Sequence, residues 1–361
     1  MNTGPAARNR RRMMALACTP ALMAATIAAP AFAGDVTLPP ISVGAGLRTS
    51  FTHTDIDGSS PKANDFSLDS ARIYISGAAL PFLKFSFDTD YDGGDSKLTV
   101  IDAIARFEFS PTMNIWAGRF LPPSDRANLN GPYYSNEWGF ATEGIEDGFP
   151  FYAAGRDNGV AYWGDFGKLK VSVGGFDVPA TDASSADSNH IVTAGRIQYD
   201  FWDAEPGYYL NGTYYGDKDI LALGVAAQHA NGDTALTADG LMEKKIGGGG
   251  VVSLEGEYAH YDAPFSGYGY AGQKSSDGGF GLAAYLFPQK IGIGQIQLLG
   301  KYASNSYDVP GPDVKRSTTE GDINYVIKSF NARLSLFFMD VNYTHAPGDY
   351  TQVGLGLQVQ I

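Results

Sequence analysis

The sequence predicts an all-β fold, a transmembrane antiparallel up-and-down β-barrel with a long constriction loop that folds inward. Three observations predict it. The N-terminus has the pattern of an export signal, apolar and polar residues alternate through most of the chain, and no run after residue 33 has 18 consecutive apolar residues. A strand that separates lipid from a watery lumen needs such alternation.

The first 33 residues have the three parts of a secretory signal peptide. Residues 1–14 are basic and contain no acid, an apolar run follows from about Ala15, and the run ends in Ala31-Phe32-Ala33. A membrane anchor would need a longer apolar run without prolines. We therefore expect residues 1–33 to be cleaved and residues 34–361 to form a single domain in the bacterial outer membrane.

Composition excludes several other classes of protein. The formal net charge of −13 argues against nucleic-acid binding, which needs a basic surface. The single cysteine, Cys18, lies in the predicted signal, so the mature chain has no disulfide and no thiolate metal site. Charged residues make up only 18% of the chain, and helical spacing of apolar residues is almost absent, unlike in most soluble proteins.

The period-two pattern is clearest at the C-terminus. Val353, Leu355, Leu357, Val359 and Ile361 alternate with glutamine and glycine. The same pattern along other segments assigns five charged side chains to the polar, lumen-facing side: Arg72, Asp88, Asp90, Arg106 and Arg196.

The strand count follows from the segments that alternate. We count about 17 candidates, whereas a bacterial single-chain barrel uses an even number. The doubtful stretch is 178–219, which contains a candidate strand at 207–216. We expect 16 strands, with 18 as the alternative, and 16 strands leave an aqueous channel.

The longest connection runs from Pro122 to about Asp157. A loop of this length in a compact domain is usually functional. Its aromatic residues form either a surface for solutes or, as we favour, a small core that holds the loop in place. We name this stretch, about 122–157, the constriction loop.

Short motifs around this loop resemble a known family. They are Phe66–Gly77 with an arginine and a final glycine, Ile101-Asp102-Ala103, Gly118-Arg119-Phe120-Leu-Pro-Pro123, and Arg156-Asp157-Asn-Gly159. Together they resemble the phosphate-selective porin O and P family. The resemblance implies a trimeric outer-membrane pore of 16 strands whose constriction loop folds into the barrel. Its partners would be outer-membrane lipid, small solutes or ions, and two further copies of the chain.

The expected function is passive diffusion of small hydrophilic solutes and ions, without a cofactor. The alternative is an anion- or phosphate-selective channel, but acids outnumber bases between residues 119 and 157, which favours cations or neutral solutes. Six charged residues are candidates for the constriction: Arg119, Asp125, Arg126, Glu137, Glu143 and Glu146. Arg119 is the first choice because we place it on the polar face of the strand before the loop. Alternatively, most of these are solvated loop charges.

The remaining motifs give weaker evidence for a functional site. Asp88-Thr-Asp90-Tyr-Asp92-Gly93 matches the start of a calcium loop, but Thr99 stands where the bidentate glutamate belongs. We therefore expect no metal site, and the scattered histidines do not change this. No catalytic motif is present, so we expect no enzyme. A barrel hydrolase and an adhesin or receptor are the rival classes.

Overall fold

The computed structural model describes residues 41–58, 62–93, 96–139, 155–177, 191–230, 232–262 and 272–361. The chain divides into two compact units, Met1–Leu38 and Pro39–Ile361, and every described residue belongs to the second. The predicted signal peptide and the loop acids Glu143 and Glu146 lie outside the described residues. Within those residues, no helix has the length and apolar character needed to cross a membrane.

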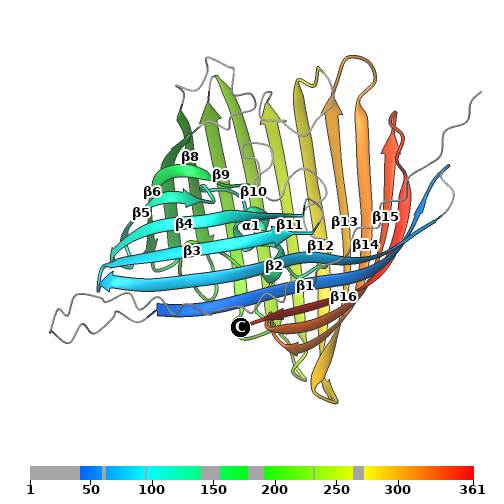
Figure 1. Cartoon of the computed structure of the whole chain (residues 1–361), viewed down its shortest axis with the longest axis horizontal. Coiled ribbons are helices and arrows are strands. Elements are labelled where there is room, and N and C mark those ends of the chain that lie inside the picture. The colour runs from blue at the N-terminus through cyan, green and yellow to red at the C-terminus, as the bar shows by residue number, and fades with distance from the viewer. Residues whose placement is uncertain are drawn as a thin grey trace, which may run out of the picture. The chain divides into compact units, whose positions relative to one another are not determined.

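Sixteen strands form one closed antiparallel barrel, in which each strand pairs with its sequence neighbours and β1 closes the ring against β16 (Figure 1). This confirms the predicted fold class and strand number. The strands are β1 (Ile41–Ile56), β2 (Ala63–Leu80), β3 (Leu83–Asp92), β4 (Lys97–Ser110), β5 (Met113–Phe120), β6 (Asp157–Phe166), β7 (Leu169–Asp177), β8 (Ile191–Asp200), β9 (Ile220–Ala230), β10 (Asp233–Lys245), β11 (Val251–Asp262), β12 (Ser275–Ile291), β13 (Gly294–Asp308), β14 (Val314–Lys328), β15 (Ala332–Thr344) and β16 (Tyr350–Gln360).

The alternation in the sequence becomes two faces of the barrel wall. On β16, Val353 and Leu355 are 46% and 54% exposed on the outer face, whereas Gln358 is fully buried on the inner face. Leu355 pairs with Leu336 of β15, which is also exposed on the outer face. A band of exposed apolar side chains around a polar interior is what a membrane-spanning barrel requires.

The candidate strand at 207–216 is wrong. Residues 201–219 connect β8 to β9 without forming a strand, and we call them the inner segment. Gly207 and Gly216 adopt left-handed φ angles of 96° and 83°, and they mark the two ends of the stretch that alternates. The backbone of the stretch at 207–216 is hydrogen-bonded to the constriction loop and not to a neighbouring strand. For example, the N–H of Leu210 donates to the carbonyl oxygen of Leu129 (3.2 Å).

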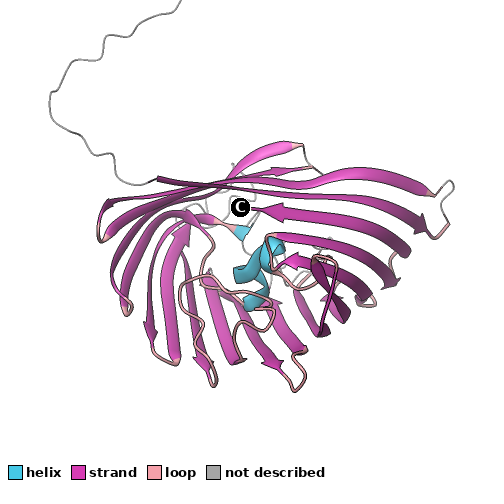
Figure 2. Ribbon diagram, turned by 90° about the horizontal axis from the view of Figure 1, so that it is seen from below, coloured by secondary structure: helices cyan, strands magenta, loops and turns pink. Residues whose placement is uncertain are grey.

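Two connections enter the barrel from opposite ends. The constriction loop joins β5 to β6 and carries the only helix among the described residues, α1 (Arg126–Tyr134). Figure 2 shows α1 inside the ring of strands. In an up-and-down barrel, connections that follow odd-numbered strands lie at one end and those that follow even-numbered strands lie at the other. The inner segment follows β8, so it starts from the end opposite to the constriction loop.

Candidate functional site

Acidic side chains of the barrel wall hold the constriction loop by its backbone N–H groups. Asp239 accepts from Arg126 N (3.2 Å), and Glu257 accepts from Ala127 N (3.3 Å) at the start of α1. Such N–H groups have no partner within their own helix and are a natural site for a carboxylate. Further along the loop, Glu320 accepts from the N–H of Gly139 (2.6 Å).

Basic side chains of the wall hold the same loop by its carbonyl oxygens. Arg333 donates to the carbonyl oxygens of Ser135 (3.1 Å) and Asn136 (2.8 Å). Lys301 donates to the carbonyl oxygen of Gly139 (3.0 Å). The Arg333 side chain is fully buried. These wall charges are therefore part of the support of the loop rather than a solvated lining.

Aromatic side chains of the loop pack into spaces that wall glycines leave open. Tyr133 is fully buried, and a Cβ atom on Gly46 would lie 2.7 Å from its ring. A Cβ atom on Gly356 would lie 2.3 Å from the ring of Trp138, over which Arg48 is placed at 4.2 Å. Tyr133 and Trp138 thus help to hold the loop in place, as we favoured, whereas Tyr134 is exposed. The loop residues 140–154 lie outside the described residues.

Three of the predicted constriction residues are buried and paired. Asp125 caps α1 by accepting from Asn128 N–H (2.8 Å), and burial raises the pKa of its carboxyl. Arg126 forms a bidentate ion pair with Glu205 of the inner segment (2.9 and 2.5 Å). The carboxylate of Glu137 lies 3.5 Å from the ammonium of Lys301. All three are nearly inaccessible to water, so they position the loop and do not line an opening.

The expectation that Arg119 lines the constriction requires a correction. Arg119 pairs with Ala103 of β4, and Ala103 lies on the outer face between the inward Asp102 and Ile104. Its guanidinium lies 4.0 Å from Asp157 and donates to Val100 O (3.1 Å) at the rim. Alternation from Ile115 through Ala117 would already have placed Arg119 on the apolar face.

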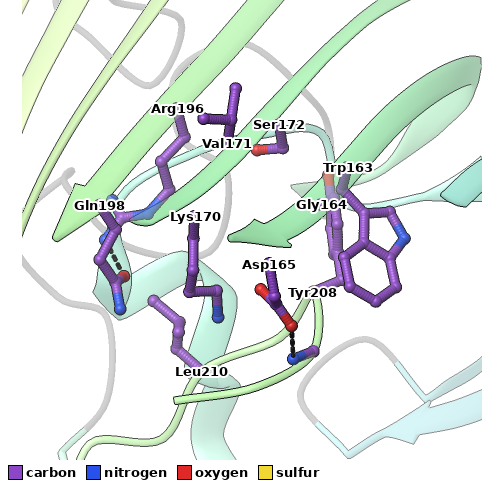
Figure 3. Close-up of a pocket in the computed structure, with 11 residues that line it drawn as sticks. Trp163, Gly164, Asp165, Lys170, Val171, Ser172, Arg196, Gln198, Tyr208 and Leu210 are labelled. Atoms are coloured by element: carbon purple, nitrogen blue, oxygen red, sulfur yellow. Dashed lines mark hydrogen bonds between the residues drawn. The ribbon is translucent and has the colours of Figure 1, made fainter. Parts of the chain in front are cut away.

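The inner segment is held to the wall and to the loop at several points. Asp165 accepts from the Gly207 N–H (2.9 Å), and Lys170 donates to the carbonyl oxygen of Glu205 (2.6 Å). Figure 3 shows Asp165 and Lys170 around a cavity of about 20 Å³, where Tyr208 and Leu210 of the segment meet the wall. A cavity of that size holds about one water molecule.

The inward side chains of the barrel differ in burial between two parts of the wall. Those that face the loop and inner segment from β8 to β16 are almost completely buried, such as Glu243 and Arg333. On β3 and β4 two inward cations keep contact with water: the side chains of Lys84 and Arg106 are 41% and 26% exposed. Within the described residues, the water-accessible lumen therefore lies along β2, β3 and β4.

A cavity of about 410 Å³ occupies this accessible part of the lumen. It lies between β3 and β4 on one side and the inner segment on the other. Its lining residues are Ser86, Asp88, Asp102, Ile104, Arg106, Glu108, Trp116, Trp163, Gly207, Tyr208 and Tyr209. We call it the lumen cavity.

Most charges in and around the lumen cavity are neutralised by a neighbour. Glu108 lies between Lys84 (2.7 Å) and Arg106 (2.6 Å). Asp102 accepts from Arg156 (3.1 Å) and from the Tyr209 hydroxyl (3.1 Å). Asp88 is bonded to the backbone of Ile75 but has no hydrogen bond or ion pair to any described side chain.

The structure places all five predicted lumen-facing charges on the inner face. Arg72 and Asp90 form an ion pair across β2 and β3 (2.8 Å), and the Arg72 guanidinium lies 4.9 Å from the Tyr133 ring centre. Asp88 and Arg106 line the lumen cavity. Arg196 instead binds Asp239 (2.8 Å) beneath α1, and it is buried there.

The acidic run at residues 88–93 lies on β3 and the turn that follows, with Asp90 committed to Arg72. Among the described residues, no group of three or more His, Cys, Asp or Glu side chains is placed to hold a metal ion.

Sequence reasoning missed the residues that join the two inward connections. The sequence places Glu205 in a connection and Tyr208 and Tyr209 in the candidate strand at 207–216. It gives no reason to select Asp239. The available signal was the odd strand count, together with Pro206 beside a tyrosine-rich stretch that alternates. The partners lie far apart in the sequence, so local pattern gives no hint of the pairs.

Comparison with known proteins identifies the fold. The sequence matches no known protein family and no curated protein. Among solved structures, OmpF of Salmonella typhi, in a complex with daunomycin, is similar with a TM-score of 0.59 and 14% identity over 90% of this chain and 98% of its own. The anion-selective porin of Comamonas acidovorans has a TM-score of 0.58 and 14% identity, over 90% of this chain and 100% of its own. OmpT of Vibrio cholerae in its trimer form has a TM-score of 0.50 and 12% identity, over 89% and 99% of the two chains.

These likenesses extend over almost the whole of each chain, including the full ring of strands. At such low identity, they show that this chain shares the fold of outer-membrane porins. They do not show that the chain belongs to the phosphate-selective porin O and P family, for which the sequence motifs are the only support.

Proposed function

We propose that this protein is an outer-membrane porin that lets small hydrophilic solutes and ions diffuse passively along the β2–β4 side of its lumen. The observation that carries the proposal is the water-accessible lumen cavity inside a closed 16-stranded barrel. Sixteen strands are wide enough for an aqueous channel, and here two inward connections narrow it.

The charges favour neutral and cationic solutes. Each arginine of the accessible lumen contacts an acid, as in the pairs Arg72–Asp90 and Arg156–Asp102, while Arg106 shares Glu108 with Lys84. Asp88 adds a carboxyl group that no described side chain neutralises. An unmatched carboxylate in a narrow pore attracts cations and repels anions.

The setting of the channel is part of the same proposal. We place the protein in the outer membrane after removal of residues 1–33, with the end that carries the chain termini facing the periplasm. The family resemblance and the trimer form of OmpT support a homotrimer. We assign no cofactor and no enzymatic activity, because diffusion through an open barrel requires neither.

The test is a recording from residues 34–361, refolded and inserted into a planar lipid bilayer under a salt gradient. We expect discrete conductance steps in groups of three and a reversal potential that favours cations. Absence of steps from a barrel shown to be folded by its heat-dependent gel mobility would contradict the proposal.

The anion- or phosphate-selective channel is the alternative outcome of that experiment. A reversal potential that strongly favours chloride, with phosphate blocking the current, would replace the cation-favouring proposal. Arg72, Arg106 and Arg156 would then be the residues to substitute first.

A further inference from the structure

The two connections that enter the lumen meet each other there. Arg126, the first residue of α1, is fully buried and donates hydrogen bonds from both of its terminal guanidinium nitrogens to the carboxylate of Glu205. It also donates to the carbonyl oxygen of Asn211 (2.8 Å). A bidentate arginine–carboxylate pair fixes the relative orientation of its two partners as well as their distance.

The contact extends beyond this ion pair. The N–H of Gly212 donates to the carbonyl oxygen of Tyr134 (2.9 Å), at the end of α1. The Tyr208 hydroxyl donates to the carbonyl oxygen of Leu121 (2.8 Å), where β5 has just ended. The inner segment therefore follows the constriction loop from Leu121 to Tyr134.

The inner segment also reaches across the lumen to the accessible wall. The Tyr209 hydroxyl donates to Asp102 of β4 (3.1 Å), and Gly207, Tyr208 and Tyr209 line the lumen cavity. On its other side, the carboxylate of Glu243 on β10 accepts from Thr213 Oγ1 (2.6 Å). The segment thus lies between two parts of the wall and bounds the lumen cavity.

We propose that the inner segment is a second constriction element, locked to the first by the Arg126–Glu205 pair, and that it sets the size limit of the pore. In this arrangement the constriction loop fills the β8–β16 side of the lumen, while Tyr208 and Tyr209 determine how much of the β2–β4 side stays open. The inference rests on the proposed channel function but assigns the selectivity for size to a connection from the opposite end of the barrel.

The ends of the segment allow it to be removed cleanly. Phe201 N–H donates to Leu221 O (2.7 Å) and Asp203 N–H donates to Asp219 O (2.9 Å), so the backbone stays paired beyond the ends of β8 and β9, as far as residues 203 and 219. Replacement of residues 204–218 by Asn-Gly would close these strands with a favoured two-residue hairpin turn. The variant would also carry Arg126→Met, so that no guanidinium is left buried without its partner.

The first experiment compares this excision variant with the wild type in planar bilayers and in liposome swelling with polyethylene glycols of increasing size. We expect single-channel conductance to rise at least about twofold, with a larger exclusion limit, because a 16-stranded barrel is wide once its inward elements are removed. Lys290→Gln, an exposed residue at the end of β12 and at the same end of the barrel, is the control and should leave both quantities unchanged. Unchanged conductance and exclusion limit in a folded excision variant would overturn the proposal.

A second variant keeps the chain intact in case the excised protein does not fold. Leu129→Cys together with Leu210→Cys places a thiol on each of the two connections, in a mature chain that we expect to have no other cysteine. If the inner segment normally lies in the lumen, the oxidised protein conducts like the wild type and reduction changes nothing. A lower conductance after oxidation that reduction reverses would show that the segment normally lies elsewhere, and would overturn the proposal.

These outcomes separate the inference from the function on which it rests. A wild type without any conductance contradicts the proposed open channel. If the excision variant of such a silent protein conducts, the inner segment is a complete plug, and its role as the limiting element stands.

Discussion

Asp88 on β3 and Asp102 on β4 are directly paired across the two strands, and both face the lumen cavity. Asp102 is neutralised by Arg156 and bonded to Tyr209, whereas Asp88 is bonded to the backbone of Ile75 and pairs with no described side chain. Two carboxyl groups in neighbouring positions therefore differ: one is bonded to the inner segment, and the other is the one through which we propose that the channel acts on passing ions.

The variant Asp88→Asn tests that available charge. It should lower the permeability ratio of potassium to chloride by roughly a factor of two, since one unmatched charge acts on ions at close range in a narrow pore. Reversal potentials under a salt gradient measure it. Asp55→Asn, which removes an exposed carboxylate at the rim next to Lys62, is the matched control. Equal ratios for both variants would show that Asp88 does not contribute to selectivity.

The variant Arg126→Met tests the junction between the two inward connections. It leaves Glu205 buried without its cation, so we expect a loss of about 3–5 kcal/mol in the free energy of unfolding. The double variant Arg126→Met/Glu205→Gln should recover part of this loss, because Asp239 keeps Arg196 as a partner. Urea unfolding in detergent, followed by tryptophan fluorescence, measures both. A loss no larger in Arg126→Met than in the surface variant Lys62→Gln would contradict the assignment.

Glu205 also predicts how stability depends on pH. Burial would raise the pKa of this carboxyl, but the charge of Arg126 and its hydrogen bonds lower it from 4.5 to about 2. A depressed pKa contributes stability that is complete above the unfolded value of 4.5 and is lost as pH falls towards 2. The difference in unfolding free energy between wild type and Glu205→Gln should therefore shrink over this range, by about 3 kcal/mol at most. A difference that stays constant from neutral pH to about pH 2 would contradict the ionised pair.

The variant Gly356→Val tests the packing of the loop residue Trp138 against the barrel wall. The added side chain would meet the indole ring, which stacks on Phe337 with ring centres 5.7 Å apart. Displacing the ring should cost about 1–3 kcal/mol in unfolding free energy. Gly300→Val is the control, since a Cβ atom there has no neighbour within 4 Å. Similar stability of the two variants would show that the wall tolerates the overlap.

The barrel itself could be predicted from the sequence because each strand carries its own alternation of apolar and polar residues. Alternation along β16 assigns each side chain to lipid or lumen without knowledge of any other strand, and the same holds for Arg72 and Asp90. The even number of strands then follows from closure. The prediction for Arg119 failed because we assigned it to the polar face of its strand, whereas the alternation from Ile115 through Ala117 places it on the outer face.

The site depends on contacts that no local pattern contains. Arg126 and Glu205 lie 79 residues apart, and Arg333 reaches loop carbonyl groups nearly 200 positions away. The stretch at 207–216 alternates as a strand does, but it turns into the lumen because its tyrosines and backbone groups find partners on α1 and the wall. The sequence alone thus determined the barrel and the two faces of its wall. Only the tertiary structure showed that the inner segment also enters the lumen and which charges find partners there, because those partners come from strands and connections that are distant in the sequence and meet only when the barrel closes.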